Sequence, residues 1–273
     1  MGFLRFPGIL VRQIGENAKT EFQPFGSDTT GPWMGYQIPR EILDQILMNQ
    51  AVRKGATIIQ PCRAIQPIRA GERVIGVATD RGEFFSDWVV DATGRKNWLA
   101  RHLKLGFEKR SNRKVVSYGY VESTDTDLHL IPLFRFKTDG WTWIARTTDR
   151  TIAWVRLYTD SARKPYERPT ELASFSDTGE IHYANMTWRT SKRVAGDGWC
   201  LVGDAADVLD PSSSRGVLKA AMNGIMVAHL LEKSFEGALT RHQLQSYFQR
   251  WMRESFEKQT QDLAQSSFGG AIK

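Results

Sequence analysis

One loop of the sequence combines residue types that suit a polar organic ligand. Gly203, Asp204 and two alanines follow directly after the short apolar strand 199–202. A carboxylate at a strand end accepts hydrogen bonds from sugar-like hydroxyls, and small neighbours let a planar ligand approach the backbone. Pro211 follows, and Gly216 opens a helix whose unpaired amides and positive dipole end favour negative charge. The pattern indicates a flavin with Asp204 on its ribityl chain, and an ordinary capped turn is the alternative interpretation.

Two helices follow this loop. The first is predicted to begin at Gly216, with Ser213 or Ser214 as its cap. It carries apolar residues at helical spacing, namely Leu218, Ala221, Met222, Ile225 and Met226. The last helix begins near Thr240, where Thr240 and Gln243 form a capping-box pair.

The part of the chain before the loop reads as one helix followed by strands. The first 38 residues are rich in Gly and Pro and predict irregular chain. Pro39 opens a helix over 39–54, and Gly55 takes the left-handed position after it. Strands are predicted at 57–62, 73–79 and 84–91, separated by turn-forming residues.

An antiparallel sheet is predicted between Lys114 and Tyr158, where four segments are rich in aromatic and β-branched residues. Alternation places Trp141 and Trp143 on one face of their strand and Trp154 on one face of the next. These rings fill a core by default, because aromatic side chains dominate core burial. The alternative is a wall for a flat organic substrate, with Trp143 and Trp154 as its residues.

Three segments, in this order, resemble the flavin-dependent monooxygenase and tryptophan halogenase-like superfamily, which has the p-hydroxybenzoate hydroxylase fold and includes geranylgeranyl reductases. They are YQIPREILDQILMNQAVRKGA, WVVDATGR and GWCLVGDAADVLDPSSSRGVLKAAMNGIMVAHLL. The resemblance implies FAD as the cofactor, with NAD(P)H or a separate reductase as electron donor. The FAD-binding residues that it implies are Arg40, Asp91, Gly94, Gly203, Asp204, Ala205, Pro211, Arg215 and Gly216.

The resemblance also implies the fold class. We expect an α/β protein with α+β elements, in which a partial Rossmann-like FAD-binding domain carries an inserted antiparallel β-sheet substrate domain. The incomplete FAD-binding domain would comprise residues 1–110 and 190–235. The substrate domain would comprise 111–189, and 236–273 would form a C-terminal helix.

The sequence departs from the family at its start. Members of the superfamily open with a βαβ unit whose G-x-G-x-x-G turn binds the FAD pyrophosphate. No glycines with this spacing follow a predicted strand here, and no α/β stretch precedes Pro39. We therefore expect an N-terminally truncated chain, a complementing N-terminal polypeptide, or a remnant. The chain alone is expected to bind FAD weakly or not at all.

The expected reaction is oxygen transfer by a monooxygenase, through a flavin peroxide, to an aromatic or apolar substrate. A halogenase is an alternative because Trp141 and Trp143 match a W-x-W element of the halogenases. Ala145-Arg146 replaces the Ile-Pro that completes that element, which favours hydroxylation. A reductase of the same fold, and a non-catalytic fragment or partner subunit, are also compatible with the sequence. No catalytic acid or base stands out, and the five histidines lack metal-ligand spacing.

The composition sets the broad class. Hydrophobic residues make up 41% and charged residues 25% of 273 residues, which is typical of globular proteins. The net charge of +7 is too small for a dedicated nucleic-acid binder. Eight basic residues and one acid lie between Arg95 and Lys114, a solvated face or a docking surface for a reductase or a carrier-bound substrate. Two isolated cysteines and the lack of a signal or transmembrane segment predict free thiols and a cytoplasmic protein.

Overall fold

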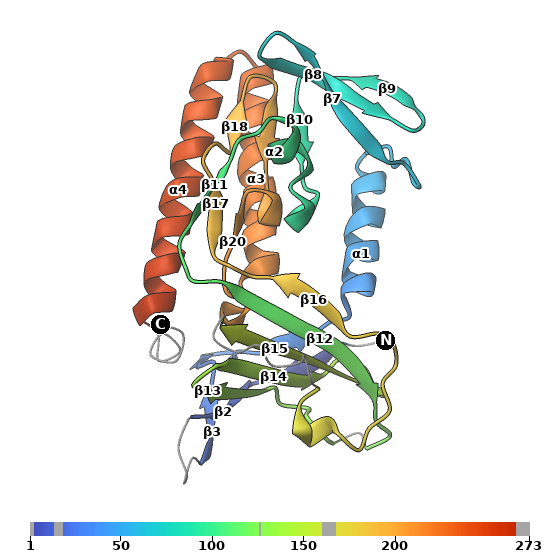
Figure 1. Cartoon of the computed structure of the whole chain (residues 1–273), viewed down its shortest axis with the longest axis vertical. Helices are drawn as coiled ribbons and strands as arrows, with labels where there is room; N and C mark the ends of the chain where they lie inside the picture. The colour runs from blue at the N-terminus through green and yellow to red at the C-terminus, as the bar shows by residue number, and fades with distance from the viewer. Residues whose placement is uncertain (1–2, 14–18, 126, 160–167, 266–273) are drawn as a thin grey trace. The chain divides into compact units, whose positions relative to one another are not determined.

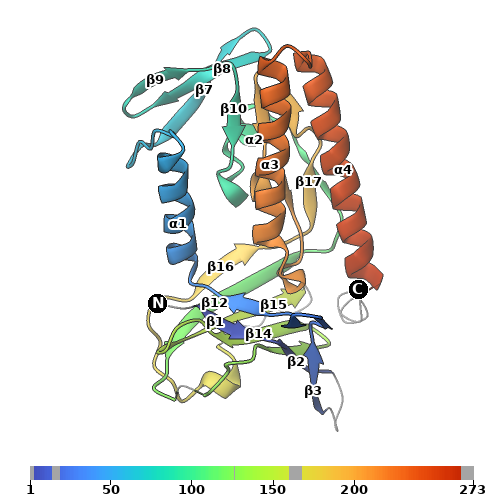
Figure 2. The ribbon, with the colours of Figure 1, turned by 180° about the vertical axis from the view of Figure 1, so that it is seen from behind.

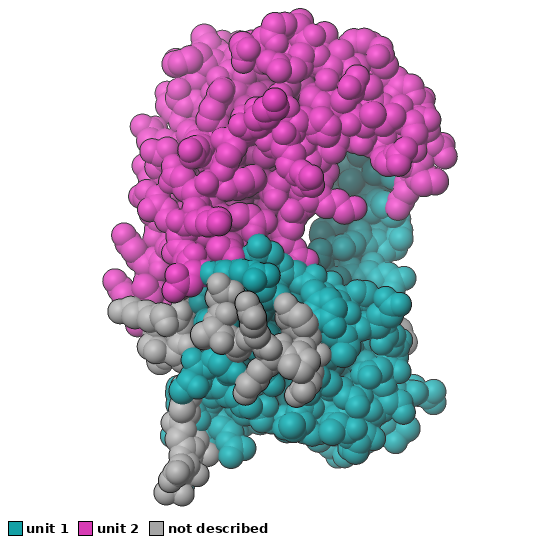
Figure 3. Space-filling view, in the orientation of Figure 1, with its two compact units in different colours: residues 1–58, 113–185, 267–273 teal, residues 59–112, 186–266 magenta. Residues whose placement is uncertain are grey.

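The chain forms two compact units. The computed structural model describes residues 3–13, 19–125, 127–159 and 168–265. Unit 1 comprises Met1–Ile58, Arg113–Asn185 and Ser267–Lys273, and unit 2 comprises Ile59–Asn112 and Met186–Ser266 (Figure 3). The mixed α/β class is confirmed, because unit 1 is mainly antiparallel sheet and unit 2 combines a parallel strand pair with helices. The predicted boundaries assigned the first helix to the FAD-binding domain, whereas this division assigns it to unit 1. The domain boundaries stay a prediction.

Unit 1 is built on a seven-stranded sheet. In spatial order its strands are β16 (His182–Asn185), β12 (Lys114–Glu122), β15 (Thr151–Thr159), β14 (Gly140–Arg146), β13 (Leu133–Lys137), β2 (Gly8–Arg12) and β3 (Thr20–Pro24). All neighbouring strands are antiparallel except β13 and β2, which are parallel. The antiparallel sheet predicted between Lys114 and Tyr158 is therefore confirmed.

The prediction of irregular chain before Pro39 is wrong. β2 and β3 extend the large sheet, and short pairs join β1 (Leu4–Phe6) to β6 (Gly35–Gln37) and β4 (Ser27–Asp28) to β5 (Gly31–Pro32). Leu10 of β2 pairs with Leu133, far along the chain. Local composition does not reveal such a distant partner, because strand formation depends on the neighbouring strand. Helix α1 (Arg40–Arg53) confirms the helix predicted over 39–54.

The two tryptophans predicted to contact substrate lie on opposite faces of this sheet. Trp143 is paired with Val155, whereas Ile144 is paired with Trp154. Residues directly opposite each other on neighbouring strands share a face, and successive residues alternate. Trp143 and Trp154 therefore cannot form one wall.

Within its described residues, unit 2 contains three small sheets and three helices. The sheets are β10 (Val89–Asp91) with β19 (Trp199–Leu201) and β18 (Ala195–Gly196); β7 (Ala64–Ala70) with β8 (Arg73–Thr79) and β9 (Gly82–Phe85); and β11 (Phe107–Lys109) with β17 (Arg189–Ser191) and β20 (Asp207–Val208). The helices are α2 (Trp98–His102), α3 (Gly216–Phe235) and α4 (Arg241–Gln265). Figures 1 and 2 show α3 and α4 side by side, and both contribute to one buried core with β19.

Two strand predictions in unit 2 need correction. Residues 57–62 form no strand, since Pro61 offers no backbone N–H to a sheet. The strand predicted over 84–91 is two strands, because β9 pairs with β8 whereas β10 pairs with β19. The strand at 73–79 is confirmed as β8.

The two long helices have different outcomes. For α4 the capping box is confirmed, because the Thr240 N–H donates to Gln243 Oε1 at 2.9 Å and the Gln243 N–H donates to Thr240 Oγ1 at 3.2 Å. For α3, the apolar residues at helical spacing are exposed except Met226, which packs against the core. The buried residues of this helix are Lys219, Asn223, Val227 and Leu230. Leu218 and Ile225 are 61% and 64% exposed. The opposite side of the helix faces the loop before α3, where Lys219 and Asn223 form hydrogen bonds with the loop.

Both cysteines, Cys62 and Cys200, are free thiols as predicted. Burial raises the pKa of the Cys200 thiol to about 12. Within the described residues, no helix is both long and apolar enough to cross a membrane.

Candidate functional site

The carboxyl ends of two parallel strands define the site in unit 2. Asp91, the last residue of β10, pairs with Leu201, the last residue of β19. Because parallel strands end at the same edge of a sheet, the loops that follow both strands lie at one edge, where α/β proteins bind ligands. The Val202 N–H donates to the Asp91 carbonyl at 3.0 Å and holds the two loops together at their origin.

Asp91 shapes the first of these loops. Its buried carboxylate accepts the Thr93 N–H at 2.7 Å through Oδ1 and the Leu99 N–H at 2.8 Å through Oδ2. Both oxygens therefore bind backbone, so the structure gives Asp91 a role in loop geometry. Gly94 follows at φ +64°, a left-handed conformation, and a side chain added there would meet open space. Contact of Asp91 and Gly94 with a cofactor stays a prediction.

Asn97 joins the two loops, and no motif in the sequence pointed to it. Its buried Nδ2 donates to the carbonyls of Asp204 and Ala205, at 3.1 Å each. The residue is left-handed at φ 49°, a conformation that asparagine tolerates better than most residues. Asn97 lies inside the basic run 95–114. A polar residue directly before the apolar Trp98 and Leu99 is the sequence signal for it.

The second loop begins with a glycine whose backbone is fixed from the helix side. Gly203 has φ +57°, and a Cβ there would lie 3.4 Å from the Cβ of Ala220. Its N–H donates to Oδ1 of the buried Asn223 at 2.9 Å. The Gly203 backbone therefore lies close against α3, which positions the next residue at the edge of the sheet.

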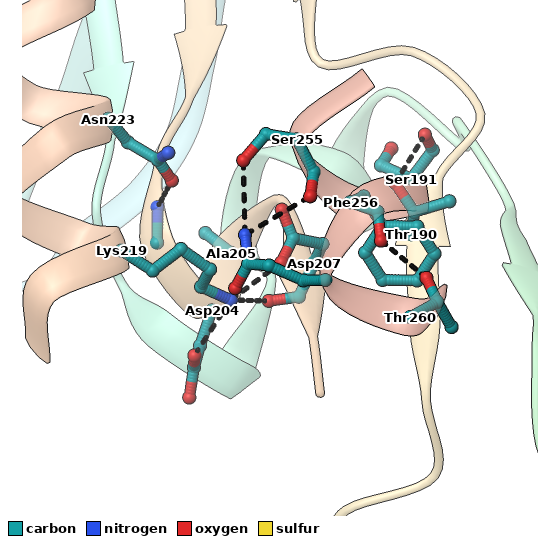
Figure 4. A network of polar contacts seen from close by, with 12 residues as sticks. Thr190, Ser191, Asp204, Ala205, Asp207, Lys219, Asn223, Ser255, Phe256 and Thr260 are labelled. Carbon is teal, nitrogen blue, oxygen red and sulfur yellow. Dashed lines mark hydrogen bonds and ion pairs between the residues drawn. The ribbon is translucent and has the colours of Figure 1, made fainter. Parts of the chain in front are cut away.

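Asp204 presents a carboxylate to solvent beside a buried ion pair. Its side chain is 39% exposed, and Oδ1 lies 3.6 Å from Nζ of Lys219. Lys219 donates to the carbonyl and to Oδ1 of Asp207, at 2.6 Å each (Figure 4). Burial raises the pKa of Asp207, the Lys219 ammonium opposes the rise, and Asp204 adds to it. Burial also lowers the pKa of Arg189, and Asp204 opposes that change, so this guanidinium lies within Coulombic range of Asp204.

The alanines after Asp204 do not face a ligand. Ala205 and Ala206 are fully buried, and Ala206 belongs to the hydrophobic core of unit 2. Their small side chains allow the loop to pack against the core, whereas the sequence pattern predicted that they admit a planar ligand. Contact of Ala205 with the cofactor is therefore limited to its backbone and stays a prediction.

The start of α3 is open. Pro211 begins a short 3-10 turn that Asp210 caps through its Oδ1, which accepts the Ser212 N–H at 3.0 Å. Neither predicted serine caps α3. Arg215 is the N-cap without a side-chain hydrogen bond, and it pairs instead with Asp262 at 2.9 Å. A Cβ at Gly216 would meet nothing within 4 Å. Packing within the described chain therefore does not require glycine at this position.

The remaining predicted residues belong to unit 1. Arg40 is the first residue of α1 and forms an exposed ion pair with Asp44 at 3.1 Å. Trp143 is half-buried, on the sheet face that also carries Phe134, its neighbour on β13. Trp154 is fully buried in a cluster with Val121, Ile144, Ile152 and Leu172. The structure thus gives Trp154 a packing role, and the roles predicted for Arg40 and Trp143 stay predictions.

The site lies where two parallel strands end, between two loops joined by Asn97 and beside an open helix N-terminus. This arrangement defines the class of protein, a Rossmann-like α/β protein. The sequence model of the tryptophan halogenase family matches residues 15–269. The chain belongs to this family.

Individual relatives agree with the family assignment. The flavin-dependent halogenase armH2 of Armillaria mellea is 23% identical over 94% of this chain and 58% of its own length. A digeranylgeranylglycerophospholipid reductase of Methanothrix thermoacetophila is 26% identical over 85% and 63%. A 1H-pyrrole-2-carbonyl-(peptidyl-carrier protein) brominase of Pseudoalteromonas luteoviolacea is 26% identical over 86% and 63%. The chain thus spans less than two thirds of the length of these relatives.

The fold is shared with solved structures of the same kind. The structure of the flavin-dependent brominase Bmp2 superposes with a TM-score of 0.83 at 19% identity, covering 99% of this chain and 73% of that chain. At this level of identity the likeness supports the fold alone.

Proposed function

We propose that this chain is the catalytic part of an FAD-dependent oxidoreductase. The single observation that carries the proposal is the exposed Asp204 carboxylate, held at the sheet edge by a loop that Asn97 and Asn223 fix. A carboxylate of this kind accepts hydrogen bonds from the hydroxyls of a ribityl chain. FAD also fits the opening of α3, where a Cβ at Gly216 would meet no protein atom. The flavin dependence named for the relatives supports the same cofactor.

Each part of the loop has a defined task in this proposal. Asp204 binds and orients the polyol, and the amides of the first turn of α3 stabilise negative charge on the adjacent ring edge. Bound FAD supplies oxidation and reduction chemistry, including reaction of its reduced form with O₂. Trp143, which is half-buried beside the buried Phe134, offers aromatic surface for an aromatic or apolar substrate.

We further propose that the ADP half of FAD is bound by residues outside these 273, as in a truncated chain completed by an N-terminal polypeptide. Residues 3–13 and 19–37 contain short strands and no helix, so the described chain before α1 holds no βαβ unit. Within the described residues, β10 pairs only with β19 and leaves one edge unpaired. Together with the shorter length of this chain compared with its relatives, these features support a strand and a helix that lie outside these residues.

Two reactions are compatible with this chemistry. Oxygen transfer to the substrate is favoured by Ala145-Arg146 in place of the Ile-Pro of halogenases. Halogenation is favoured by the family itself and by the halogenase names of its relatives. Incubation with reduced FAD, O₂ and candidate aromatic substrates, with and without bromide, separates the two by product mass. A brominated product identifies halogenation, and a hydroxylated product in both samples identifies a monooxygenase.

The proposal extends to partners and location. The brominase relative that acts on a carrier-bound pyrrole supports a carrier-bound substrate here, with electrons from NAD(P)H or a separate reductase. Free thiols at both cysteines support a cytoplasmic location.

Substitution of Asp204 tests the cofactor assignment. Asp204→Ala is expected to weaken FAD binding, because a hydrogen bond to a charged group contributes about 1.5 to 3 kcal/mol. Equilibrium dialysis of the full chain against FAD measures the loss. Glu236→Ala, an exposed carboxylate paired with Lys233 at the other end of α3, is the matched control. Equal FAD binding by Asp204→Ala and wild type contradicts the proposal, as does a wild-type chain without saturable binding of FMN, which keeps the isoalloxazine and the ribityl chain but lacks the adenylate.

A further inference from the structure

A lysine occupies the buried face of α3 at its first turn. Lys219 shares this face with Asn223, Val227 and Leu230, and its side chain is only 6% exposed. Burying an ammonium is unfavourable unless it is paired and hydrogen-bonded. The positive end of the helix dipole at the N-terminus adds to the cost. A lysine at this position therefore depends on specific anionic partners.

The two anionic partners of Lys219 differ in their exposure. Asp207 is 4% exposed and accepts two hydrogen bonds from Nζ, at 2.6 Å each. Asp204 is 39% exposed, and its Oδ1 lies 3.6 Å from the same nitrogen. Figure 4 shows the ammonium between the two carboxylates. Asp207 therefore fixes the position of the ammonium, and the ammonium then attracts Asp204.

The longer distance to Asp204 has a chemical consequence. At 3.6 Å the contact is an ion pair without a hydrogen bond, so the acceptor sites of this carboxylate are left for a ligand. The attraction nevertheless restricts which way the side chain points. Arg189 adds positive charge within Coulombic range, but its guanidinium carbon lies over the ring of Phe107, 5.7 Å from the ring centroid.

The other buried groups of the loop hold only its backbone. Asn97 binds the carbonyls of Asp204 and Ala205, and Asn223 binds the N–H of Gly203. Both amides therefore fix where the loop runs and leave the direction of the Asp204 side chain open. The orientation of the carboxylate is thus left to the buried ammonium of Lys219.

We propose that Lys219 is a positioning residue, which, clamped by Asp207, orients the Asp204 carboxylate toward the polyol hydroxyls of the flavin. This role rests on the proposed function. Lys219 itself is too buried to touch the ligand, and it acts through Asp204. Its contribution to flavin binding therefore disappears when Asp204 can no longer carry charge.

A double-mutant cycle in the full chain tests this role. Lys219→Met keeps the length of the side chain and removes its charge, and Asp204→Asn removes the charge on which it acts. Lys233→Met, an exposed lysine of α3 paired with Glu236 at 2.7 Å, is the matched control. The dissociation constants of FAD and of FMN, which keeps the isoalloxazine and the ribityl chain but lacks the adenylate, are measured by equilibrium dialysis up to about 1 mM flavin. Hydrogen exchange of the amides at 203–208 is followed without FAD.

Lys219→Met is expected to weaken FAD binding about tenfold, the loss of one charge-assisted contact. Lys233→Met is expected to bind FAD as the wild type does. The Asp204→Asn, Lys219→Met double variant is expected to bind no more weakly than Asp204→Asn alone. Exchange at 203–208 is expected to be faster in Lys219→Met. If this variant does not fold, Lys219→Arg, which moves the charge and keeps it, is expected to weaken FAD binding in a folded chain.

The failures are distinguishable. A wild-type chain without saturable binding of FMN overturns the proposed function and the positioning role with it. Wild-type affinity in a folded Lys219→Met chain overturns only the positioning role. Additive losses in the double variant do so too, because Lys219 would then act without Asp204. Unchanged hydrogen exchange at 203–208 in Lys219→Met overturns the claim that the ion pair of Lys219 and Asp207 holds this loop in place.

Discussion

A single asparagine carries much of the geometry at the candidate site. Asn97 has a left-handed backbone, and its buried amide bridges to two consecutive carbonyls of the loop after β19. Few residues combine both properties, since asparagine tolerates positive φ and offers two amide hydrogens. The bridge makes the position of Asp204 depend on the loop after β10.

Substitution of Asn97 separates its two properties. Asn97→Ala is expected to lower the free energy of unfolding by about 2 to 4 kcal/mol, because buried carbonyls lose their donor and alanine resists positive φ. Asn97→Gly removes the amide but keeps the backbone conformation, so it is expected to lose less. Urea unfolding of both variants measures the difference. Equal stability of Asn97→Ala and wild type would contradict the bridge.

A buried arginine organises the end of the sheet in unit 1. Arg146 is 1% exposed, and its guanidinium donates to the carbonyls of Leu128, Thr148, Asp149 and Asp125 and to the hydroxyl of Ser123. This residue replaces the proline of the halogenase element, and the structure gives it a role in holding loops. Burial and then the charge of Arg146 lower the pKa of His129, which has φ 57°.

The lowered pKa of His129 predicts a pH dependence of stability. Below about pH 6.5 the unfolded chain binds a proton at this histidine before the folded chain does. The free energy of unfolding is therefore expected to fall as the pH decreases below this value. His129→Asn, which also tolerates positive φ, is expected to flatten the dependence in urea unfolding at several pH values. His242→Asn on α4 is the control, and a wild-type slope in His129→Asn would refute the assignment.

At the scale of the element, the sheet of unit 1 depends on a glycine beneath a tryptophan. Gly119 of β12 is paired with Trp154 of β15. A Cβ at Gly119 would lie 3.0 to 3.2 Å from atoms of the Trp154 ring. Because Trp154 is fully buried, the ring has little freedom to move away.

Gly119→Ala is therefore expected to destabilise the sheet by about 1 to 3 kcal/mol, the usual range for overpacking a core. Thermal and urea unfolding measure the effect. Gly179→Ala is the matched control in the same unit, since a Cβ there would meet nothing within 4 Å. A Gly119→Ala chain as stable as this control would show that the ring moves aside.

The sequence predicted elements well where local signals suffice. The helix α1 has Pro39 before it, and α4 has its capping box, so both boundaries are readable from nearby residues. β2 pairs with β13, more than 100 residues away, a contact that local composition does not encode. β2 also pairs with the nearby β3, and this pairing was missed because the Gly and Pro residues of the first 38 positions predicted irregular chain. The four central strands β12 to β15 of the large sheet were predicted, but the faces of Trp143 and Trp154 depend on register between strands, which the alternation within one strand leaves undetermined.

The candidate site shows the same limit. The Gly203-Asp204 loop was predicted because a glycine and a carboxylate after a strand form a local pattern. Asn97, Lys219 and Asn223 were missed because each acts on a loop distant in sequence. On α3, most of the apolar residues at helical spacing are exposed, and the buried face combines Lys219 and Asn223 with Val227 and Leu230.

At the scale of the whole molecule, this burial pattern leaves apolar surface uncovered on α3. Val217, Leu218, Met222 and Ile225 are between 45% and 64% exposed. Leu218, Met222 and Ile225 are spaced four and three residues apart, so they lie on one side of the helix. A continuous apolar stripe on a protein surface marks a place where another polypeptide packs. The unpaired edge of β10 in the same unit is a second such place within the described residues.

The uncovered stripe predicts that the chain on its own exposes a binding surface for apolar probes and self-associates. The double variant Leu218→Glu, Ile225→Glu is expected to bind less 8-anilinonaphthalene-1-sulfonate and to sediment more slowly at equal concentration, because it interrupts the stripe with charge. Its free energy of unfolding is expected to stay within about 0.5 kcal/mol of wild type, since both side chains are exposed. Phe235→Glu is the matched control, because Phe235 is 67% exposed on the same helix but outside the stripe. If the control reduces dye binding as much as the double variant does, the stripe is not the surface that a further polypeptide covers.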